Sequence, residues 1–444
     1  MFNTNVVVLN SFQATTELLE KRSKIYSDRP HTVMFHELTG WHRNFGLLQY
    51  GDMWRMYRRT FHQYFRNQAV PSFHQKMKRT VNKLLVALTD SPDDFLAHYR
   101  YMTGSLAFDV SYGMDVDSIK YPAIETAEKA VQCMLEIMST GSFLVDTLPI
   151  LKYLPAWLPG ADFKKKAIQW RRCVDEMFTR PFKIAKNEWE HAHLKPSIAL
   201  DLFRSMQDSQ KDDPNFEEVI TNITAVTYVG GTDTSTSTLR MFTWIMLSYP
   251  SVQAKAHEEI DRVIGRNRLP ELRDKETLPY ITALLKEVLR WRPIGPLGIQ
   301  HRSTADDEYK GYFLPGGSIV IANTWAVLRD EKRYPNAQIF DPCRFLNDHG
   351  ALDPTIPDPT EAFGYGRRIC PGRYYATDLL WLTIANVLAA YVIEKTIDEH
   401  GDIIEPKDEF TTGLHCLPVS VKASFVPRHE EAVDLIRSLV ASSD

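Results

Sequence analysis

The sequence has few cysteines, and they are not arranged as a disulfide framework or a zinc site. Only five cysteines occur among 444 residues, and no two of them stand in a CxxC spacing. An odd, scattered set argues against paired disulfides and structural zinc, and it fits a reducing compartment. Each cysteine therefore has to be considered singly: Cys133, Cys173, Cys343, Cys370 and Cys416.

Long apolar runs and a strong excess of charge are also missing. No apolar stretch reaches the roughly 18 residues of a membrane-spanning helix. The nearest, residues 379–393, is interrupted by Thr383 and Asn386, so we expect a buried helix there. The first residues lack a basic segment followed by an apolar core, which argues against a signal peptide. A net charge of −4 gives no reason to expect nucleic acid as a partner.

No Gly/Ser-rich linker, repeat or low-complexity stretch divides the chain, so we expect one large domain over residues 1–444. Apolar residues at three- and four-residue spacing dominate, and they predict a mainly α fold with minor β structure. The expected helices span 13–26, 50–65, 73–90, 216–250, 251–265, 281–293 and 377–397. Strands are expected late, as a hairpin over 309–327 around a Pro-Gly-Gly turn and as a strand within 417–427.

Residues 141–167 combine apolar side chains with closely spaced prolines. Pro149, Pro155 and Pro159 prevent a long helix, so much apolar surface must lie on short turns. Two interpretations are open for this segment. It is either a connection packed on the core or a mobile apolar lid that touches a membrane or admits an apolar substrate.

The stretch FGYGRRICPG, residues 363–372, gives Cys370 the setting of a metal-bound thiolate. Pro371 and Gly372 precede helical sequence, and the free amides and dipole of a helix start favour a negative sulfur. The glycines let the backbone approach something large and flat. Arg368 is placed to reach an anionic group of the same ligand, and Phe363 to cover the sulfur. A soft anionic ligand in a dry pocket suits haem iron.

Five positions of this stretch, Phe363, Gly366, Arg368, Cys370 and Gly372, match the signature FxxGxRxCxG. Such a match arises by chance on the order of once in ten thousand chains of this length. The sequence therefore resembles the cytochrome P-450 haem-thiolate monooxygenases. That resemblance implies a large helix-rich fold in which haem b (iron protoporphyrin IX) lies between the long central helix and the helix after Cys370. It also implies that Cys370 is the axial iron ligand.

The resemblance extends to an ExxR pair and its downstream arginine. Glu287 and Arg290 are spaced i, i+3 and share a helix face. In the family this pair meets an arginine from a PERF segment. Here the segment reads FDPCRFL, so Arg344 is present while Cys343 stands where the family usually has glutamate. The three charged residues are implied to buttress the haem pocket without doing chemistry.

The middle of the longest expected helix carries GGTDTS, residues 230–235. Two adjacent glycines cost a helix roughly 1 kcal/mol each relative to alanine, so a reason other than helix stability is required. Thr234 and Asp233 match the family's acid–alcohol pair, which delivers protons to iron-bound oxygen. They are the implied catalytic residues.

Three further residues match positions that bind the haem propionates in the family. Trp54 and Arg58 lie one helical turn apart in a WxxxR arrangement, and both side chains are donors only. His301, in IQHRST, stands where the family often has another propionate donor. It is the weakest of these assignments, since a lone histidine after a Pro-rich loop is commonly a surface residue.

No GxGxxG motif follows a strand, so nicotinamide and flavin are expected on a separate NADPH–cytochrome P-450 reductase, with cytochrome b5 as an optional second donor. A basic patch on the thiolate side of the haem would steer such an acidic flavoprotein, and it comprises Arg55, Arg58, Arg59, Arg367 and Arg373. The substrates are implied to be O₂ and a hydrophobic small molecule such as a terpenoid, a steroid or a polycyclic aromatic.

The resemblance covers about residues 6–427 and is nearest to fungal microsomal members, with 428–444 as a tail. The family's N-terminal anchor and first helix have no counterpart in this sequence. The family implies the cytosolic face of the endoplasmic reticulum membrane and contact with the membrane surface. Two alternatives stay open: a reductase-independent haem-thiolate isomerase or dehydratase, and an inactive haem-binding remnant.

Overall fold

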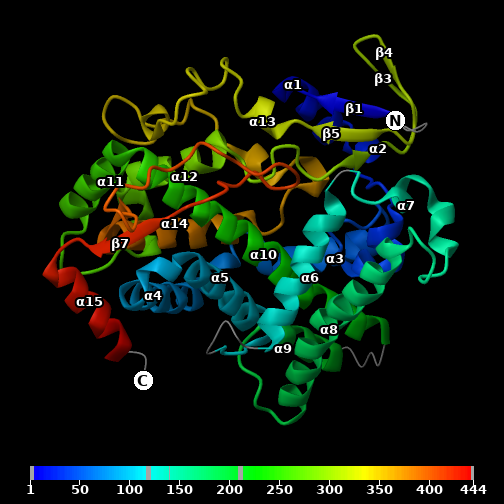
Figure 1. Ribbon diagram of the computed structural model, residues 1–444, viewed down its shortest axis with the longest axis horizontal. Coiled ribbons are helices and arrows are strands. Elements are labelled where there is room, and N and C mark those ends of the chain that lie inside the picture. The colour runs from blue at the N-terminus through cyan, green and yellow to red at the C-terminus, as the bar shows by residue number, and fades with distance from the viewer. Residues whose placement is uncertain (1–4, 117–121, 140, 209–213, 442–444) are drawn as a thin grey trace.

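A computed structural model describes residues 5–116, 122–139, 141–208 and 214–441 and shows a mainly helical protein (Figure 1). Helix α10, Pro214–Ser248, runs through the middle of the molecule for 35 residues. Helix α5, Phe95–Tyr112, packs along it, with the rings of Phe108 and Tyr228 5.0 Å apart. The expected long helix over 216–250 is confirmed.

Two more helices complete the centre, α12, Pro279–Trp291, and α14, Arg373–Ala390. From Leu379 onward helix α14 is mostly apolar on every side, because almost every residue there is buried. Leu379, Trp381 and Ile384 are fully buried, and the Trp381 indole donates to Thr282 Oγ1 on α12 at 3.0 Å. Burying each such side chain stabilises the fold by roughly 1.5–3 kcal/mol.

The remaining helices surround this centre. The longer ones are α3 Asp52–Phe65, α4 His74–Asp90, α6 Pro122–Met138, α8 Asp162–Glu190, α9 Ile198–Asp208, α11 Pro250–Val263 and α15 Glu430–Ala441. The single-turn helices are α1 Phe12–Thr15, α2 Ser23–Tyr26, α7 Leu144–Thr147 and α13 Thr324–Val327. The helices expected over 50–65, 73–90 and 251–265 correspond to α3, α4 and α11. The first predicted helix, 13–26, is a succession of short helical segments.

The strands form small sheets at the edge of the helical body. Strand β5, Ile319–Ala322, lies between β1, Val6–Leu9, which is parallel to it, and β2, His301–Arg302, which is antiparallel. Strands β3, Asp307–Tyr309, and β4, Tyr312–Leu314, form a hairpin. Strands β6, Tyr391–Lys395, and β7, Ala423–Pro427, form a second antiparallel pair.

The prediction of a hairpin that turns at Pro-Gly-Gly is wrong, because the strands on either side of that turn do not pair with each other. The hairpin turns instead at Lys310 and Gly311, whose φ angles are 52° and 80°. Two consecutive positive φ values suit the tight turn that matches strand twist. The segment after Pro315 leaves the hairpin, and its strand β5 pairs with β1 from the other end of the chain. A pairing strand so far away in the chain leaves no pattern in the sequence around β5, so the sequence could not predict this pairing.

The predicted helix over 377–397 is too long. Helix α14 ends at Ala390, and Tyr391–Lys395 is strand β6. β-Branched residues such as Val392 and Ile393 favour a strand once a partner is available, and β7 supplies it. The expected tail contains helix α15, whose Ala432 and Ile436 are buried.

Residues 141–167 fold into short turns, as the prolines predict. Helix α7 is followed by a helical turn over Pro149–Tyr153, and α8 starts only at Asp162. Ile150, Tyr153 and Trp157 are 71, 72 and 77% exposed, so this segment is not wholly packed on the core. Across the part of the chain that the structure describes, none of the helices combines the length and apolarity needed to cross a bilayer.

Candidate active site

Cys370 lies in the loop that leads into α14, close to α3. Its backbone N–H donates to the Phe363 carbonyl at 2.7 Å, which closes the loop on itself. Arg58 of α3 donates from Nη1 to the carbonyl of Ile369 at 2.7 Å, so the neighbouring peptide is fixed to α3. Cys370 as a whole residue is half-buried. The loop thus presents one sulfur on a rigid backbone.

Two opposing effects act on the pKa of the Cys370 thiol, and burial is the larger of them. Burial raises the pKa of the Cys370 thiol, and the N–H of Gly372 with the charges of Arg58 and Arg373 lowers it only in part. The helix start expected to favour a negative sulfur therefore does not hold a thiolate by itself. A cation bound at the sulfur would have to supply the rest.

One glycine of the loop is required by a close contact within the protein. Gly366 has φ 52°, and a Cβ there would lie 2.1 Å from the Leu19 carbonyl oxygen. Gly366 therefore permits a close approach to another part of the chain, and its predicted place beside a flat ligand stays a prediction. A Cβ on Gly372 would instead meet the Cys370 sulfur at 3.9 Å, an ordinary contact.

Arg368 is a buried cation with an uncommitted donor. Its Nε and Nη2 donate to the carbonyls of Ser27 and Leu48, both at 2.7 Å, and its guanidinium lies 4.5 Å from the centre of the Trp54 ring. Its Nη1 is buried without a hydrogen-bond partner. Burial lowers the pKa of Arg368 to about 9 although Asp28 opposes this. An unpaired guanidinium N–H is costly to bury, and a hydrogen bond to an anionic acceptor would remove that cost.

Arg29 adds a second buried cation that the sequence reasoning missed. It is 3% exposed and donates from Nη1 to the carbonyls of Ile299 and Gln300 at 2.6 and 2.7 Å. Burial lowers the pKa of Arg29 well below its usual value, and Arg368 lowers it further. In the sequence Arg29 stands in YSDRP, residues 26–30. No spacing relates residue 29 to residue 368, so the sequence did not predict that the two arginines lie close together.

His301 is buried in the same region, but its chemistry differs from that expected. Its Nδ1 lies 2.8 Å from the Tyr26 carbonyl, so Nδ1 carries the proton and donates. Burial and the nearby charge of Arg29 lower the pKa of His301 well below its usual value. In the neutral ring Nε2 is then an acceptor. His301 can donate to a propionate from Nε2 only if that anion first draws a proton onto the ring.

Helix α10 carries the predicted acid–alcohol pair at its middle. The Thr234 hydroxyl is exposed and donates to the Gly230 carbonyl at 2.8 Å. A Cβ on Gly230 or Gly231 would meet no protein atom within 4 Å, so no other segment requires these glycines. Asp233 is buried, with Oδ1 3.6 Å from Arg100 Nη2 and Oδ2 3.1 Å from His415 Nδ1. The sequence did not point to either partner.

The three buttress residues meet as the resemblance implies. Glu287 and Arg290 are fully buried, and Arg290 donates from Nε and Nη2 to the carboxylate at 2.6 and 2.7 Å. Arg344 donates from Nε to the same carboxylate at 3.0 Å, and the Asp341 N–H does so at 2.9 Å. The two guanidiniums also donate to carbonyls of Leu328 and Ile339. One carboxylate thus joins α12 to the loops before the Cys370 segment.

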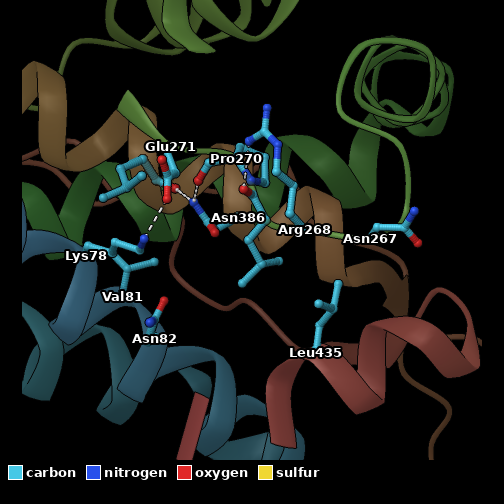
Figure 2. Close-up of a pocket in the computed structure, with 11 residues that line it drawn as sticks. Lys78, Val81, Asn82, Asn267, Arg268, Pro270, Glu271, Asn386 and Leu435 are labelled. Atoms are coloured by element: carbon cyan, nitrogen blue, oxygen red, sulfur yellow. Dashed lines mark hydrogen bonds and ion pairs between the residues drawn. The ribbon is translucent and has the colours of Figure 1, made fainter. Parts of the chain in front are cut away.

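A separate pocket of about 200 Å³ lies among α4, α14, α15 and the loop 267–271 (Figure 2). Its polar side chains largely satisfy one another. Lys78 pairs with Glu271 at 2.5 Å, and the Asn386 amide donates to the Pro270 carbonyl at 2.9 Å. This pocket has none of the features gathered around Cys370.

The residues present fit a haem group. They offer one thiol and a set of buried donors, with an unpartnered Arg368 N–H among them. A porphyrin needs a soft axial ligand and cations for its carboxylates, and this donor set provides both.

The mainly helical fold is that of a haem-dependent oxygenase, and comparison with known proteins agrees. The family model described as Cytochrome P450 matches residues 1–423. The chain belongs to the cytochrome P450 family and is a cytochrome P450 monooxygenase, an oxidoreductase. The family implies a haem-thiolate cofactor, O₂ and a redox partner.

Relatives at this level of similarity come from fungi. Cytochrome P450 monooxygenase COX2 of Coprinopsis cinerea is 41% identical over 424 residues, which are 95% of this chain and 80% of that protein. Cytochrome P450 monooxygenase ple1 of Rhodocybe pseudopiperita is 39% identical, over 98% of this chain and 83% of its own length. Tryptamine 4-monooxygenase of Psilocybe cyanescens is 38% identical, over 96% and 84%.

Proposed function

We propose that this protein inserts one oxygen atom of O₂ into a hydrophobic small molecule in fungal secondary metabolism or in xenobiotic oxidation. Two electrons from NADPH and two protons accompany the reaction, and the second oxygen atom leaves as water. The observation that carries the proposal is the convergence of Cys370, Arg58 and Arg368: Arg58 donates to the Ile369 carbonyl beside the sulfur, and its charge acts on both Cys370 and Arg368. Bound haem would supply the redox chemistry, and the chain supplies ligation, orientation and exclusion of water.

In this proposal Cys370 binds the iron through its sulfur, and buried donors hold the propionates. Arg368, Arg58, Trp54 and Arg29 are the donors present near the loop, with His301 as a donor once protonated. Phe363 fixes the loop by accepting from the Cys370 N–H. Glu287, Arg290 and Arg344 hold the loops that shape the pocket.

Thr234 and Asp233 are proposed to supply protons. The Thr234 hydroxyl is exposed on α10 and donates to the backbone of its own helix, so it can accept a proton from water and pass its own onward. Asp233 lies next to it in the chain but is buried among charged partners.

Thr234→Ala should leave haem binding unchanged and raise the hydrogen peroxide released per NADPH consumed by about tenfold, since general acid groups of this kind contribute roughly 10²–10⁴ to a rate. Thr221→Ala is the matched control, because Thr221 makes the same hydrogen bond to the carbonyl four residues back, at 2.8 Å, near the start of α10. Equal peroxide yields from the two variants would remove Thr234 from the mechanism.

The substrate class is tested with a reconstituted NADPH–cytochrome P-450 reductase and a panel of hydrophobic compounds. Terpenoids, steroids and polycyclic aromatics are included because the family resemblance implies substrates of these classes. Tryptamine belongs in the panel because one relative is named for it. We expect a hydroxylated product from at least one of these classes, and NADPH-dependent formation identifies it.

Two alternative functions have distinct signatures. A reductase-independent isomerase or dehydratase would turn over without NADPH, and the presence of Thr234 and Asp233 argues against it. An inactive haem-binding remnant would lack the thiolate-type band in a reduced-CO difference spectrum. We expect that band in the purified protein and no turnover when the reductase is omitted.

The electron donor is proposed to dock where α3 and the Cys370 loop meet. Arg55, Arg59 and Arg367 are exposed there, and Arg373 lies at the start of α14. Positive charge on this face suits an acidic flavoprotein such as the reductase, or cytochrome b5, and steers its association.

We propose association with the cytosolic face of the endoplasmic reticulum through residues 141–167. Helix α7, at the start of this segment, lies at the same end of the long axis as β1 and the β3–β4 hairpin (Figure 1). Ile150, Tyr153 and Trp157, which follow α7, are exposed. Burying a large apolar side chain yields roughly 1.5–3 kcal/mol, less the cost of ordering the turn. Such a segment supports peripheral, salt-insensitive binding.

Replacing Trp157 and Leu158 by serine should lower liposome co-sedimentation several-fold without changing the haem spectrum. The matched control replaces Ile397 and Ile403, which are 67 and 62% exposed and pair with each other away from this segment. If wild-type protein does not co-sediment with liposomes at all, the segment is not a membrane contact.

A further inference from the structure

The carboxylate of Asp233 is held from two sides by residues far away in the chain. Arg100 of α5 approaches Oδ1 at 3.6 Å, and His415 of the C-terminal loop approaches Oδ2 with Nδ1 at 3.1 Å. Asp233 is 6% exposed, so the charge depends on these partners. Neither Asp233 Oδ2 nor His415 Nδ1 makes an aligned hydrogen bond, so they meet at ion-pair distance only.

Arg100 is shared with a second carboxylate. Its Nη1 donates to Glu128 of α6 at a shorter distance than any contact it makes with Asp233. Tyr228 of α10 donates to the other Glu128 oxygen at 3.0 Å. Burial lowers the pKa of Arg100, but Glu128 and Asp233 together raise it above its usual value. Arg100 therefore favours Glu128 and holds Asp233 loosely.

Glu128 also reaches the surface. It lines a hollow of about 830 Å³ between α6 and α8, together with Glu125, Lys129 and Trp170. A row of charged groups thus runs from this hollow through Glu128 and Arg100 to Asp233, the neighbour of Thr234.

The loop that carries His415 is fastened to α10 independently of Asp233. Arg240, seven residues beyond Asp233, donates from Nη2 to the carbonyls of Pro418 and Val419. The Cys416 N–H donates to the Ile294 carbonyl at 2.8 Å. His415 is consequently a fixed contact for Asp233, with a side chain only 16% exposed.

We propose that His415 and Arg100 are positioning residues for Asp233, with His415 the principal one because Glu128 competes for Arg100. The inference rests on the proposed role of Asp233 in supplying protons. A carboxylate fixed near Thr234 keeps one orientation, whereas a released carboxylate turns toward the remaining cation.

The test uses holoenzyme, reconstituted reductase, NADPH and the panel compound with the highest turnover. His415→Ala should raise the peroxide released per NADPH at least threefold. His415→Asn should stay within twofold of wild type, because its amide nitrogen takes the place of Nδ1. Oxidation of the same compound driven by cumene hydroperoxide needs no proton supply and should be alike in all variants.

Glu128→Gln tests the competition for Arg100. It frees Arg100 for Asp233, so the peroxide excess of His415→Ala should shrink by at least half in the His415→Ala/Glu128→Gln double variant. No change would overturn the part assigned to Arg100.

Thermal unfolding gives a readout apart from turnover. In a cycle of His415→Ala, Asp233→Asn and the double variant, the loss of Tm in the double variant should be smaller than the sum of the single losses by about 1 °C or more. Additive losses, or equal peroxide yields from His415→Ala and wild type, overturn the inference. If Asp233→Asn itself releases no extra peroxide, the proposed role of Asp233 is what fails.

Discussion

Purified Cys370→Ala protein is expected to show no thiolate-type band in its reduced-CO difference spectrum and no NADPH-driven oxidation of any panel compound. The loop before α14 offers a single sulfur, and the Phe363 carbonyl and Arg58 fix the backbone that presents it. Alanine keeps that backbone, so we expect a folded protein with a melting temperature close to that of wild-type protein freed of haem.

The matched control is Cys416→Ala. Cys416 is also partly exposed, and burial likewise raises the pKa of its thiol. Its sulfur is not at the start of a helix, and its removal should leave the spectrum unchanged. A thiolate-type band that survives in Cys370→Ala would assign the ligand to another cysteine.

Glu287→Gln is expected to cause the largest loss of stability. The Glu287 carboxylate accepts from Arg290, Arg344 and the Asp341 N–H while fully buried. Gln removes the charge and leaves two guanidiniums without their counterion, and breaking a buried pair in this way costs about 3–5 kcal/mol. We expect a marked fall in the urea midpoint and most of the haem lost during purification.

Glu276→Gln is the control, because Glu276 is exposed in the 3-10 helical segment Leu272–Thr277 that precedes α12. Surface substitutions of this kind usually change the stability by no more than about 0.5 kcal/mol. If Glu287→Gln unfolded within about 1 kcal/mol of this control and kept its haem, the buttress role would be refuted.

Local patterns were sufficient for most helices and for part of the site. The helical spacing predicted α3, α4, α10, α11 and α12 because amphipathic periodicity is a property of neighbouring residues. The same holds for Glu287 and Arg290, which lie one helical turn apart. The loop around Cys370 was also readable, since its glycines, arginine and cysteine stand within ten residues. The assignment to the cytochrome P450 family came from these short motifs.

Tertiary structure decided the features that depend on distant segments. Strand β5 pairs with β1, which is more than 300 residues away in the chain, and so the predicted hairpin was wrong. Arg29 joins Arg368, and Asp233 meets Arg100 and His415, although no spacing in the sequence relates them. The close approach of the Leu19 carbonyl to Gly366 was likewise invisible in the sequence, because the two residues are far apart in the chain. A charge in a buried site takes its partners from whichever elements pack there, and that packing is set by the whole core rather than by local sequence.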